Sequence, residues 1–111
     1  STIIGSVRIN SIEKKASCGV IGYEVHPDYW NKGYATEALH AVVNHAHDVL
    51  GLHRLQAWTT VGNKASDKVL LNNGFQYEGT QRSRVNFRNQ FWDIRIYGRL
   101  AVDGYHYQHS D

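Results

Sequence analysis

Three things are scarce in this 111-residue sequence, and each absence narrows what the chain can be. Cys18 is its one cysteine, so an intrachain disulfide is impossible and a reducing, cytoplasmic setting is favoured. No apolar run reaches the length of a membrane-spanning helix. The formal net charge is only +2, which argues against binding a polyanion through bulk charge but leaves room for a local basic patch.

What is present has the composition of a globular protein, with 41% hydrophobic and 20% charged residues. We predict one domain over residues 1–102 and a polar tail over residues 103–111. Cys18 lies in a strand-like run, where we expect a small core residue rather than a nucleophile. The first residues resemble the middle of a strand, so we expect a preceding segment to be missing.

Hydrophobic periodicity predicts seven elements in the order β-β-α-β-α-β-β. The expected strands cover residues 2–11, 18–26, 52–61, 76–88 and 91–101, and the expected helices cover 33–50 and 64–72. The last two strands would form a hairpin around a turn at Asn89 and Gln90. A strand–helix–strand crossover flanked by hairpins predicts an α/β fold with a mixed, mostly antiparallel sheet of about five strands.

The helical patterns also predict which side chains face the core. In the first helix the expected inward residues are Leu39, Val42, Val43, Ala46 and Val49. The expected outward residues are Glu37, His40, Asn44, His47 and Asp48. In the second helix Ala65, Val69 and Leu70 should share the buried side, and Asn73-Gly74 should end the helix before Phe75 packs back.

The segment from Tyr29 to Ala38 joins a strand to the first helix, with Gly33 at its centre. Such a turn directs unpaired backbone N–H groups and the positive end of the helix dipole at one spot, where a phosphate can bind. Gly33 allows a ligand to approach the backbone, and Lys32 adds a positive charge. The segment is neither a Walker A loop nor a three-glycine dinucleotide fingerprint. The alternative is an ordinary strand-to-helix loop.

Three groups of residues, in register with the expected elements, resemble the GNAT superfamily of N-acetyltransferases, and within it the RimJ/RimL-like branch of ribosomal-protein N-terminal acetyltransferases. They are Trp30-Asn31-Lys32-Gly33-Tyr34-Ala35-Thr36-Glu37-Ala38, Asn63-x-x-Ser66-x-x-Val69 with Asn73-Gly74-Phe75, and Tyr77-Glu78-Gly79-Thr80 with Tyr97-Gly98-x-Leu100. The resemblance covers nearly the whole chain, from about Ile3 to Leu100. Family domains normally begin with a further strand and one or two helices that wall the acceptor site.

The resemblance implies that the protein binds acetyl-coenzyme A and transfers the acetyl group to a primary amine, on a protein N-terminus or a small molecule. It places the cofactor pyrophosphate on the backbone amides of Asn31, Lys32, Gly33, Tyr34, Ala35 and Thr36. One departure is Trp30, which stands where the superfamily often has Gln or Arg, so some side-chain help to the phosphates is lost.

The resemblance also places the pantetheine arm of the cofactor beside the strand that precedes the turn, at Glu24, Val25 and His26. Asn63 resembles the residue that hydrogen-bonds the arm from the other side. Ser66 would then be able to reach the cofactor sulfur. The alternative for Ser66 is a residue at the helix N-terminus that satisfies a backbone N–H.

Acetyl transfer needs a neutral amine, a stabilised oxyanion and a protonated leaving thiolate. We expect Ser66 to act as the acid for the thiolate and the Val25 N–H to stabilise the oxyanion. Glu24 is the candidate base or amine anchor, with His26 as the second candidate. The alternative for Glu24 is an exposed strand carboxylate. The strand from Thr80 to Gln90 holds no acid, so no base comes from it.

The last two strands are rich in arginine, and strand alternation places Arg82, Arg84 and Arg88 on one face, with Arg95 and Arg99 on the partner strand. This is either a solvated face or a surface for an acidic acceptor, ribosome or RNA. Two further functions stay open beside the enzyme: a non-catalytic acyl-coenzyme A binding module, and a nucleic-acid-binding surface. We expect no metal site, because His45 and His47 diverge on a helix. The one oligomeric state that we consider for the protein is a homodimer.

Overall fold

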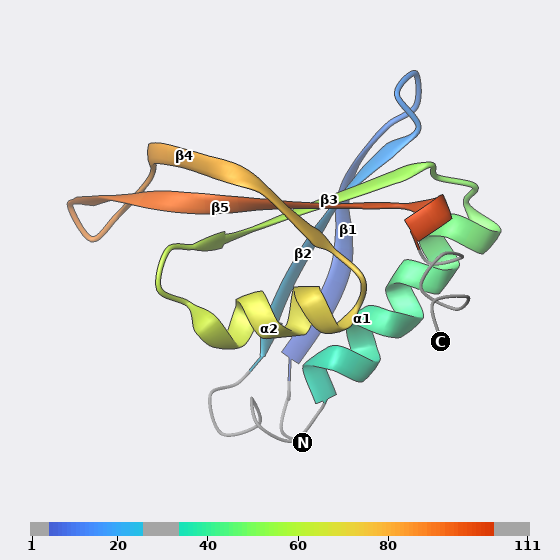
Figure 1. Cartoon of the computed structure of the whole chain (residues 1–111), viewed down its shortest axis with the longest axis horizontal. Coiled ribbons are helices and arrows are strands. Elements are labelled where there is room, and N and C mark those ends of the chain that lie inside the picture. Colours follow the sequence, from blue (N-terminus) through green and yellow to red (C-terminus); the bar gives the residue numbers. More distant parts are fainter. Residues whose placement is uncertain (1–4, 26–33, 104–111) are drawn as a thin grey trace.

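The computed structural model describes residues 5–25 and 34–103 (Figure 1). The elements are β1 (Gly5–Glu13), β2 (Cys18–Val25), α1 (Tyr34–Asn44), η2 (His45–Val49), β3 (Arg54–Thr60), α2 (Lys64–Asn72), β4 (Gln76–Phe87) and β5 (Gln90–Leu100). The predicted order of strands and helices is confirmed, with a short π-helix, η2, added after the first helix. No helix among the described residues is long and apolar enough to cross a membrane.

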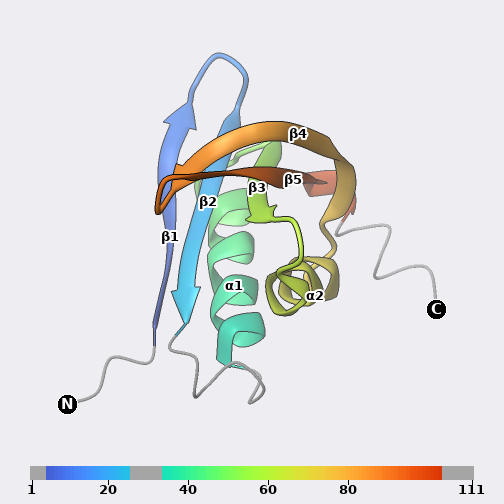
Figure 2. The same ribbon diagram turned by 90° about the vertical axis from the view of Figure 1, so that its left-hand side faces the viewer.

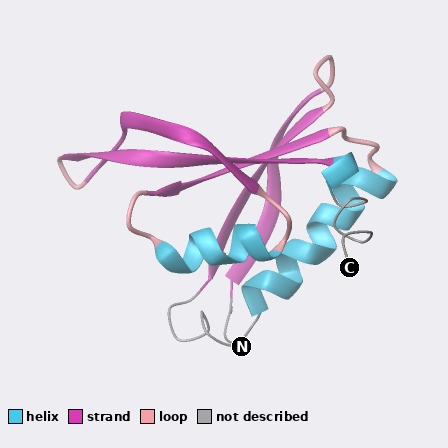
Figure 3. Cartoon of the chain, in the orientation of Figure 1, coloured by secondary structure: helices cyan, strands magenta, loops and turns pink. Residues whose placement is uncertain are grey.

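The five strands form one sheet in the order β1-β2-β3-β5-β4. Only β2 and β3 run parallel, and every other neighbouring pair is antiparallel. Helices α1 and α2 lie together on one face of the sheet, and none of the described residues forms a helix on the other face (Figures 2 and 3). The predicted mixed, mostly antiparallel α/β sheet is therefore confirmed, with one face left open.

Strand β3 shows how the sequence distinguishes the two faces. Its residues alternate between buried and exposed positions, with Leu55, Ala57 and Thr59 buried under the helices. Gln56, Trp58 and Thr60 alternate with them and therefore point to the open face. The core between sheet and helices is completed by fully buried side chains that include Leu39, Val43, Leu70, Phe75 and Tyr97.

The end of the first helix differs from the prediction. A regular α-helix would bury Val49, but Val49 is 69% exposed and His47 is half-buried. The cause is η2, in which the Leu50 N–H bonds to the carbonyl of His45, five residues earlier. This wider turn rotates the following side chains, so that Ala46 stays in the core while His47 turns inward and Val49 turns outward.

Helix α2 also buries a partly different set of residues from the predicted one. Val69 and Leu70 are buried as expected, but Ala65 is exposed and Ser66 takes its place at 7% exposure. Asn73 and Gly74 follow the helix and Phe75 packs into the core, as predicted. Ser66, the polar residue at this buried position, lines the cavity described in the next section.

The β4–β5 hairpin is confirmed, but its turn consists of Arg88 and Asn89, one residue earlier than predicted. The two ladder pairs Gln81↔Ile94 and Val85↔Trp92 leave three residues of β4 opposite one residue of β5. Because of this bulge, simple alternation does not hold between Arg82 and Arg88, so alternation no longer places Arg82, Arg84 and Arg88 on one face.

The two arginines of β5 make contacts within the protein. Arg95 lies 4.4 Å from the ring centroid of Tyr77, and Arg99 donates a 2.8 Å hydrogen bond to the carbonyl of Asn73. Both residues alternate with Ile94, Ile96 and Gly98, which pair with the open-face residues of β3. Arg95 and Arg99 therefore belong to the helix-covered side and do not add to a basic surface on the open face.

Candidate functional site

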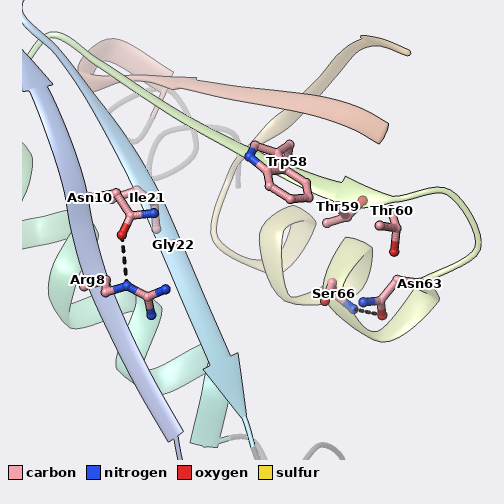
Figure 4. A pocket seen from close by; sticks show the side chains of 9 residues that line it. All are labelled: Arg8, Asn10, Ile21, Gly22, Trp58, Thr59, Thr60, Asn63 and Ser66. Carbon is pink, nitrogen blue, oxygen red and sulfur yellow. Dashed lines mark hydrogen bonds between the residues drawn. The ribbon is translucent and has the colours of Figure 1, made fainter. Parts of the chain in front are cut away.

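Strands β2 and β3 are joined for only three residue pairs, from Cys18↔Arg54 to Val20↔Gln56. Beyond that point no further pairing joins them within the described ranges, and the two strands spread apart (Figure 4). The opening holds a cavity of about 350 Å³. Its walls are Arg8 and Asn10 of β1, Ile21 and Gly22 of β2, Trp58, Thr59 and Thr60 of β3, and Asn63 and Ser66 at the start of α2.

The spreading strands give this cleft an unusual wall. A strand edge presents a row of backbone N–H and C=O groups, and an extended polar chain can pair with such an edge as an added strand would. In β2 the residues after Val20 pair with β1 on one side only, as Ser6↔Glu24 and Gly5↔Val25 show. The cleft is therefore suited to a narrow, extended ligand that carries amide groups.

Ser66 and Asn63, the two residues predicted to contact the cofactor arm, both line this cleft. The Asn63 side-chain oxygen caps α2 by accepting a 3.2 Å hydrogen bond from the Ser66 N–H. Asn63 is therefore the N-cap of α2, and its side chain also carries an amide nitrogen that can donate a hydrogen bond. Ser66 itself is 7% exposed and borders the cavity (Figure 4).

A buried polar network fixes the start of α2 against β3. Thr59 donates a 2.6 Å hydrogen bond to Asp67, the residue after Ser66. Burial raises the pKa of Tyr97 above its ordinary value, and its hydrogen bond to Asp67 adds to the rise. Tyr97 therefore stays a neutral donor at physiological pH, and the Asp67 carboxylate is held from β3 and β5 at once. The position of Ser66 is set by this network.

The predicted cofactor residues before the first helix are only partly described. Glu24 and Val25 end β2, with backbones paired to β1. His26, Asn31, Lys32 and Gly33 lie outside the described residues, so their predicted roles stay predictions.

Helix α1 begins at Tyr34, and its first residues are Tyr34, Ala35 and Thr36. The N–H groups of a first helical turn have no partner within the helix, and such groups can bind an anion. Ala35 is 2% exposed and packs in the core, so it can offer a ligand only its backbone. The Thr36 carbonyl accepts a 3.2 Å hydrogen bond from the Asn73 side chain, which ties this turn to the end of α2.

Arg8, Asn10 and Trp58 are among the cleft residues that were not predicted from the sequence. Arg8 donates a 2.9 Å hydrogen bond from Nε to Asn10, and both alternate with Val7 and Ile9, which pack against the core. That alternation was visible in the sequence and would have placed Arg8 and Asn10 on the open face. Arg8 lies opposite Gly22, where an added Cβ would meet the Asn10 amide nitrogen at 2.3 Å. No cluster of metal-ligating side chains occurs among the described residues.

Comparison with known proteins agrees with this geometry. Residues 1–76 match the model of the acetyltransferase (GNAT) domain. The uncharacterized N-acetyltransferase YoaA of Bacillus subtilis is 34% identical over 86% of this chain and 54% of its own length. The ribosomal-protein-serine acetyltransferase of Escherichia coli is 29% identical over 88% of this chain and 55% of its own length. The chain thus spans about half the length of these relatives.

Among solved structures, RimL, a ribosomal alpha-N-protein acetyltransferase in complex with coenzyme A, superposes with a TM-score of 0.81 at 25% identity. The match covers 86% of this chain and 54% of that protein. These relatives confirm the predicted resemblance to the RimJ/RimL-like branch. On the domain match and the fold together, this chain belongs to the acetyltransferase (GNAT) family.

Proposed function

We propose that this protein binds acetyl-coenzyme A in the cleft between β2 and β3 and transfers the acetyl group to a primary amine within a ternary complex. The amine is a protein N-terminus or a small molecule. The observation that carries the proposal is the cleft itself, where β2 and β3 separate after Val20↔Gln56 and open a cavity bordered by Asn63 and Ser66. Family membership supplies the reaction class.

The cleft fits the parts of this substrate. The pantetheine arm is extended and contains two amides, which match the backbone edge at the end of β2, at Val25, and the amide nitrogen of Asn63; the predicted partner His26 follows Val25 in the sequence. The pyrophosphate would bind the N–H groups of Asn31, Lys32, Gly33, Tyr34, Ala35 and Thr36, beside the Lys32 charge. Helix α1 begins within this segment, so its dipole adds positive potential there.

The chemistry assigned to this chain is modest because the thioester is already reactive. An α-amine has an unperturbed pKa of about 7.7–8.0, so a weak base is enough to neutralise it, and Glu24 or His26 is assigned that task. The Val25 N–H would stabilise the oxyanion. The Ser66 hydroxyl would protonate the departing thiolate, and its place on the cavity wall supports this role.

Isothermal titration of acetyl-coenzyme A tests the proposal, using the wild type beside Gly33→Glu and Ala41→Glu. A carboxylate at position 33 would occupy the proposed phosphate site and repel the ligand, so binding should be lost. Ala41 is an exposed residue of α1, so the same carboxylate there should leave binding unchanged. A folded wild type that does not bind the ligand would overturn the proposal, and equal losses in both variants would remove the phosphate site from the turn.

A further inference from the structure

The open face of the sheet is hollowed beyond the cleft. One cavity of about 320 Å³ lies over β3, β4 and β5, and its walls include Gln56, Arg84, Ile94 and Ile96. A second cavity, of about 450 Å³, lies toward the hairpin end, and its walls include Phe87 and Trp92. Neither cavity is part of the cofactor assignment above, and together they are called the acceptor hollow below.

Trp58 connects the acceptor hollow to the cleft. It lines the cleft cavity and both cavities of the hollow, and Thr60 is shared by the cleft and the hairpin cavity. Trp58 is 45% exposed on the face opposite the helices. A molecule in the hollow would therefore reach the part of the cleft that Ser66 borders through the gap between β2 and β3.

The chemistry of the hollow is selective. Its surface is dominated by large apolar groups that stay exposed, with Phe87 at 57% and Trp92 at 37% exposure. No aspartate or glutamate lines either cavity, and Arg84 is the charged side chain on their described walls. No salt bridge of Arg84 is found within the described part of the chain.

We propose that the acceptor hollow binds the acceptor amine and selects one that joins an apolar, ring-bearing body to a negatively charged group. The ring would pack on Trp58, Phe87 and Trp92, and the negative group would bind Arg84. A polyamine fits poorly, because no carboxylate on these walls can hold its positive charges. This proposal rests on the proposed function, since it names the acceptor for the same transfer.

The acetyl transfer needs only acetyl-coenzyme A and the acceptor amine, with no further reactant. The acceptor nitrogen forms a bond to the acetyl carbon, the carbon–sulfur bond breaks, the nitrogen loses a proton, and the thiolate gains one. Both the aromatic amino acids and peptides that begin with an aromatic residue and carry an acidic one have the required chemistry. Comparing a free amino acid with such a dipeptide separates these two sources.

The test measures thiol release from acetyl-coenzyme A by the full chain, with four small amines and one dipeptide as acceptors. The amines are L-phenylalanine, phenethylamine, L-alanine and spermidine, and the dipeptide is phenylalanyl-glutamate. We expect kcat/KM to be highest for phenylalanine or the dipeptide. Loss of the carboxylate in phenethylamine should lower it about fivefold, and loss of the ring in alanine about tenfold or more.

Paired variants assign the preference to named residues. Arg84→Gln should abolish the preference for phenylalanine over phenethylamine, whereas Arg82→Gln, a nearby exposed residue that lines neither cavity, should keep it. Trp92→Ala should abolish the preference for phenylalanine over alanine. Phe91→Ala should keep that preference, because Phe91 is exposed but lies on none of these walls.

Two outcomes overturn this proposal and leave the proposed function intact. One is efficient acetylation of spermidine, and the other is turnover that does not distinguish the five acceptors. If the chain binds acetyl-coenzyme A but acetylates none of them, titration of phenylalanine and of the dipeptide into the coenzyme A complex decides, and absence of binding rejects the acceptor hollow. Failure to bind acetyl-coenzyme A at all rejects the proposed function instead.

Discussion

Arg54 and Glu78 form a two-pronged ion pair that passes over Gly98. The Arg54 nitrogens donate hydrogen bonds of 3.0 and 2.6 Å to the two Glu78 oxygens, and β5, which carries Gly98, lies between their strands. A Cβ on Gly98 would lie 2.5 Å from Arg54 Nη1 and from Glu78 Oε2. A side chain at position 98 would therefore displace the ends of the two paired side chains.

We predict that Gly98→Ala destabilises the wild type by about 1 kcal/mol, because the pair must open and it is partly exposed to water. In a Glu78→Ala background the same substitution should be neutral or stabilising, since alanine loses less conformational freedom than glycine in a strand. Urea unfolding of the four proteins measures the coupling. Equal effects of Gly98→Ala in both backgrounds would contradict this relationship.

Asn73 connects three elements through one buried side chain and its backbone. Its amide nitrogen donates to the carbonyls of Thr36 and Val69, at 3.2 and 3.1 Å, and its own carbonyl accepts from Arg99. Asn73→Asp removes the donor and sets a carboxylate against two carbonyl oxygens. We predict a loss of about 3 kcal/mol in unfolding free energy, against about 2 kcal/mol for Asn73→Ala.

The control for this prediction is Asn72→Asp, the same change at the neighbouring exposed position, which should cost little. Because Thr36 lies in the proposed pyrophosphate turn, Asn73→Ala should also weaken acetyl-coenzyme A binding in the folded protein. An Asn73→Asp protein as stable as Asn72→Asp would show that the amide donor is not needed.

His47 gives the protein a sensitivity to acid. Its Nδ1 lies 2.7 Å from the Leu52 carbonyl, which can only accept, so Nδ1 carries the proton. Its Nε2 is buried and meets no hydrogen-bond partner among the described residues. Burial therefore lowers the His47 pKa below 6.5, although the Leu52 bond opposes this effect. His47 therefore binds a proton less readily in the folded protein than in the unfolded chain.

The folded His47 pKa is depressed, so its contribution to stability is fully present above the unfolded pKa and is lost as pH falls below it. We predict that the wild type loses more unfolding free energy than His47→Gln between about pH 7.5 and about pH 5.5. His45→Gln, at an exposed position of η2, should behave as the wild type does. Identical losses in the wild type and His47→Gln would reject the assignment.

The parts of the fold that the sequence predicted are those with local causes. Period-two and period-3.6 patterns fixed the order of the elements, and the Asn73-Gly74 cap fixed the end of α2. Asn63 and Ser66 were assigned to the cofactor through the family resemblance, and both line the cleft. The unpredicted features include η2 and the β4 bulge, in which extra backbone residues in a helical turn or a strand ladder change which side chains are buried.

The cleft could not be predicted from local sequence patterns, because it depends on strand pairing between distant residues. It exists because the parallel ladder of β2 and β3 stops after three pairs, and that register joins residues more than thirty apart in the chain. Trp58 reads from the sequence as one more aromatic strand residue. Only the separation of the strands turns it into a wall shared by the cleft and the acceptor hollow.

The hairpin turn offers a way to stabilise the protein. Arg88 and Asn89 have φ angles of 54° and 60°, so both residues are left-handed, and arginine is poorly suited to that conformation. We predict that replacing them with Asn-Gly raises the unfolding free energy by about 1 kcal/mol. Thermal and urea unfolding measure the gain. Arg88→Val, which places a β-branched residue at the same φ, should lower stability, and a gain from it would contradict the interpretation.

Ser66 provides the sharpest kinetic prediction for the proposed chemistry. If its hydroxyl protonates the leaving thiolate, Ser66→Ala should lower kcat about a hundredfold, as expected for the loss of a general acid. The dissociation constant of acetyl-coenzyme A should change little, because Asn63 and the backbone edges remain. Ser66→Cys should restore part of the rate, since a thiol of similar size can also donate a proton.

A purely structural role for Ser66 predicts a different pattern. Ser66→Ala would then lower stability, or weaken acetyl-coenzyme A binding, without a selective loss in kcat, and Ser66→Cys would restore nothing. Asp67→Asn separates the two effects, because it disturbs the bond from Thr59 that positions α2 while it leaves the Ser66 hydroxyl in place. It should raise KM and lower stability more than it lowers kcat. A normal kcat in Ser66→Ala would transfer the protonation step to water.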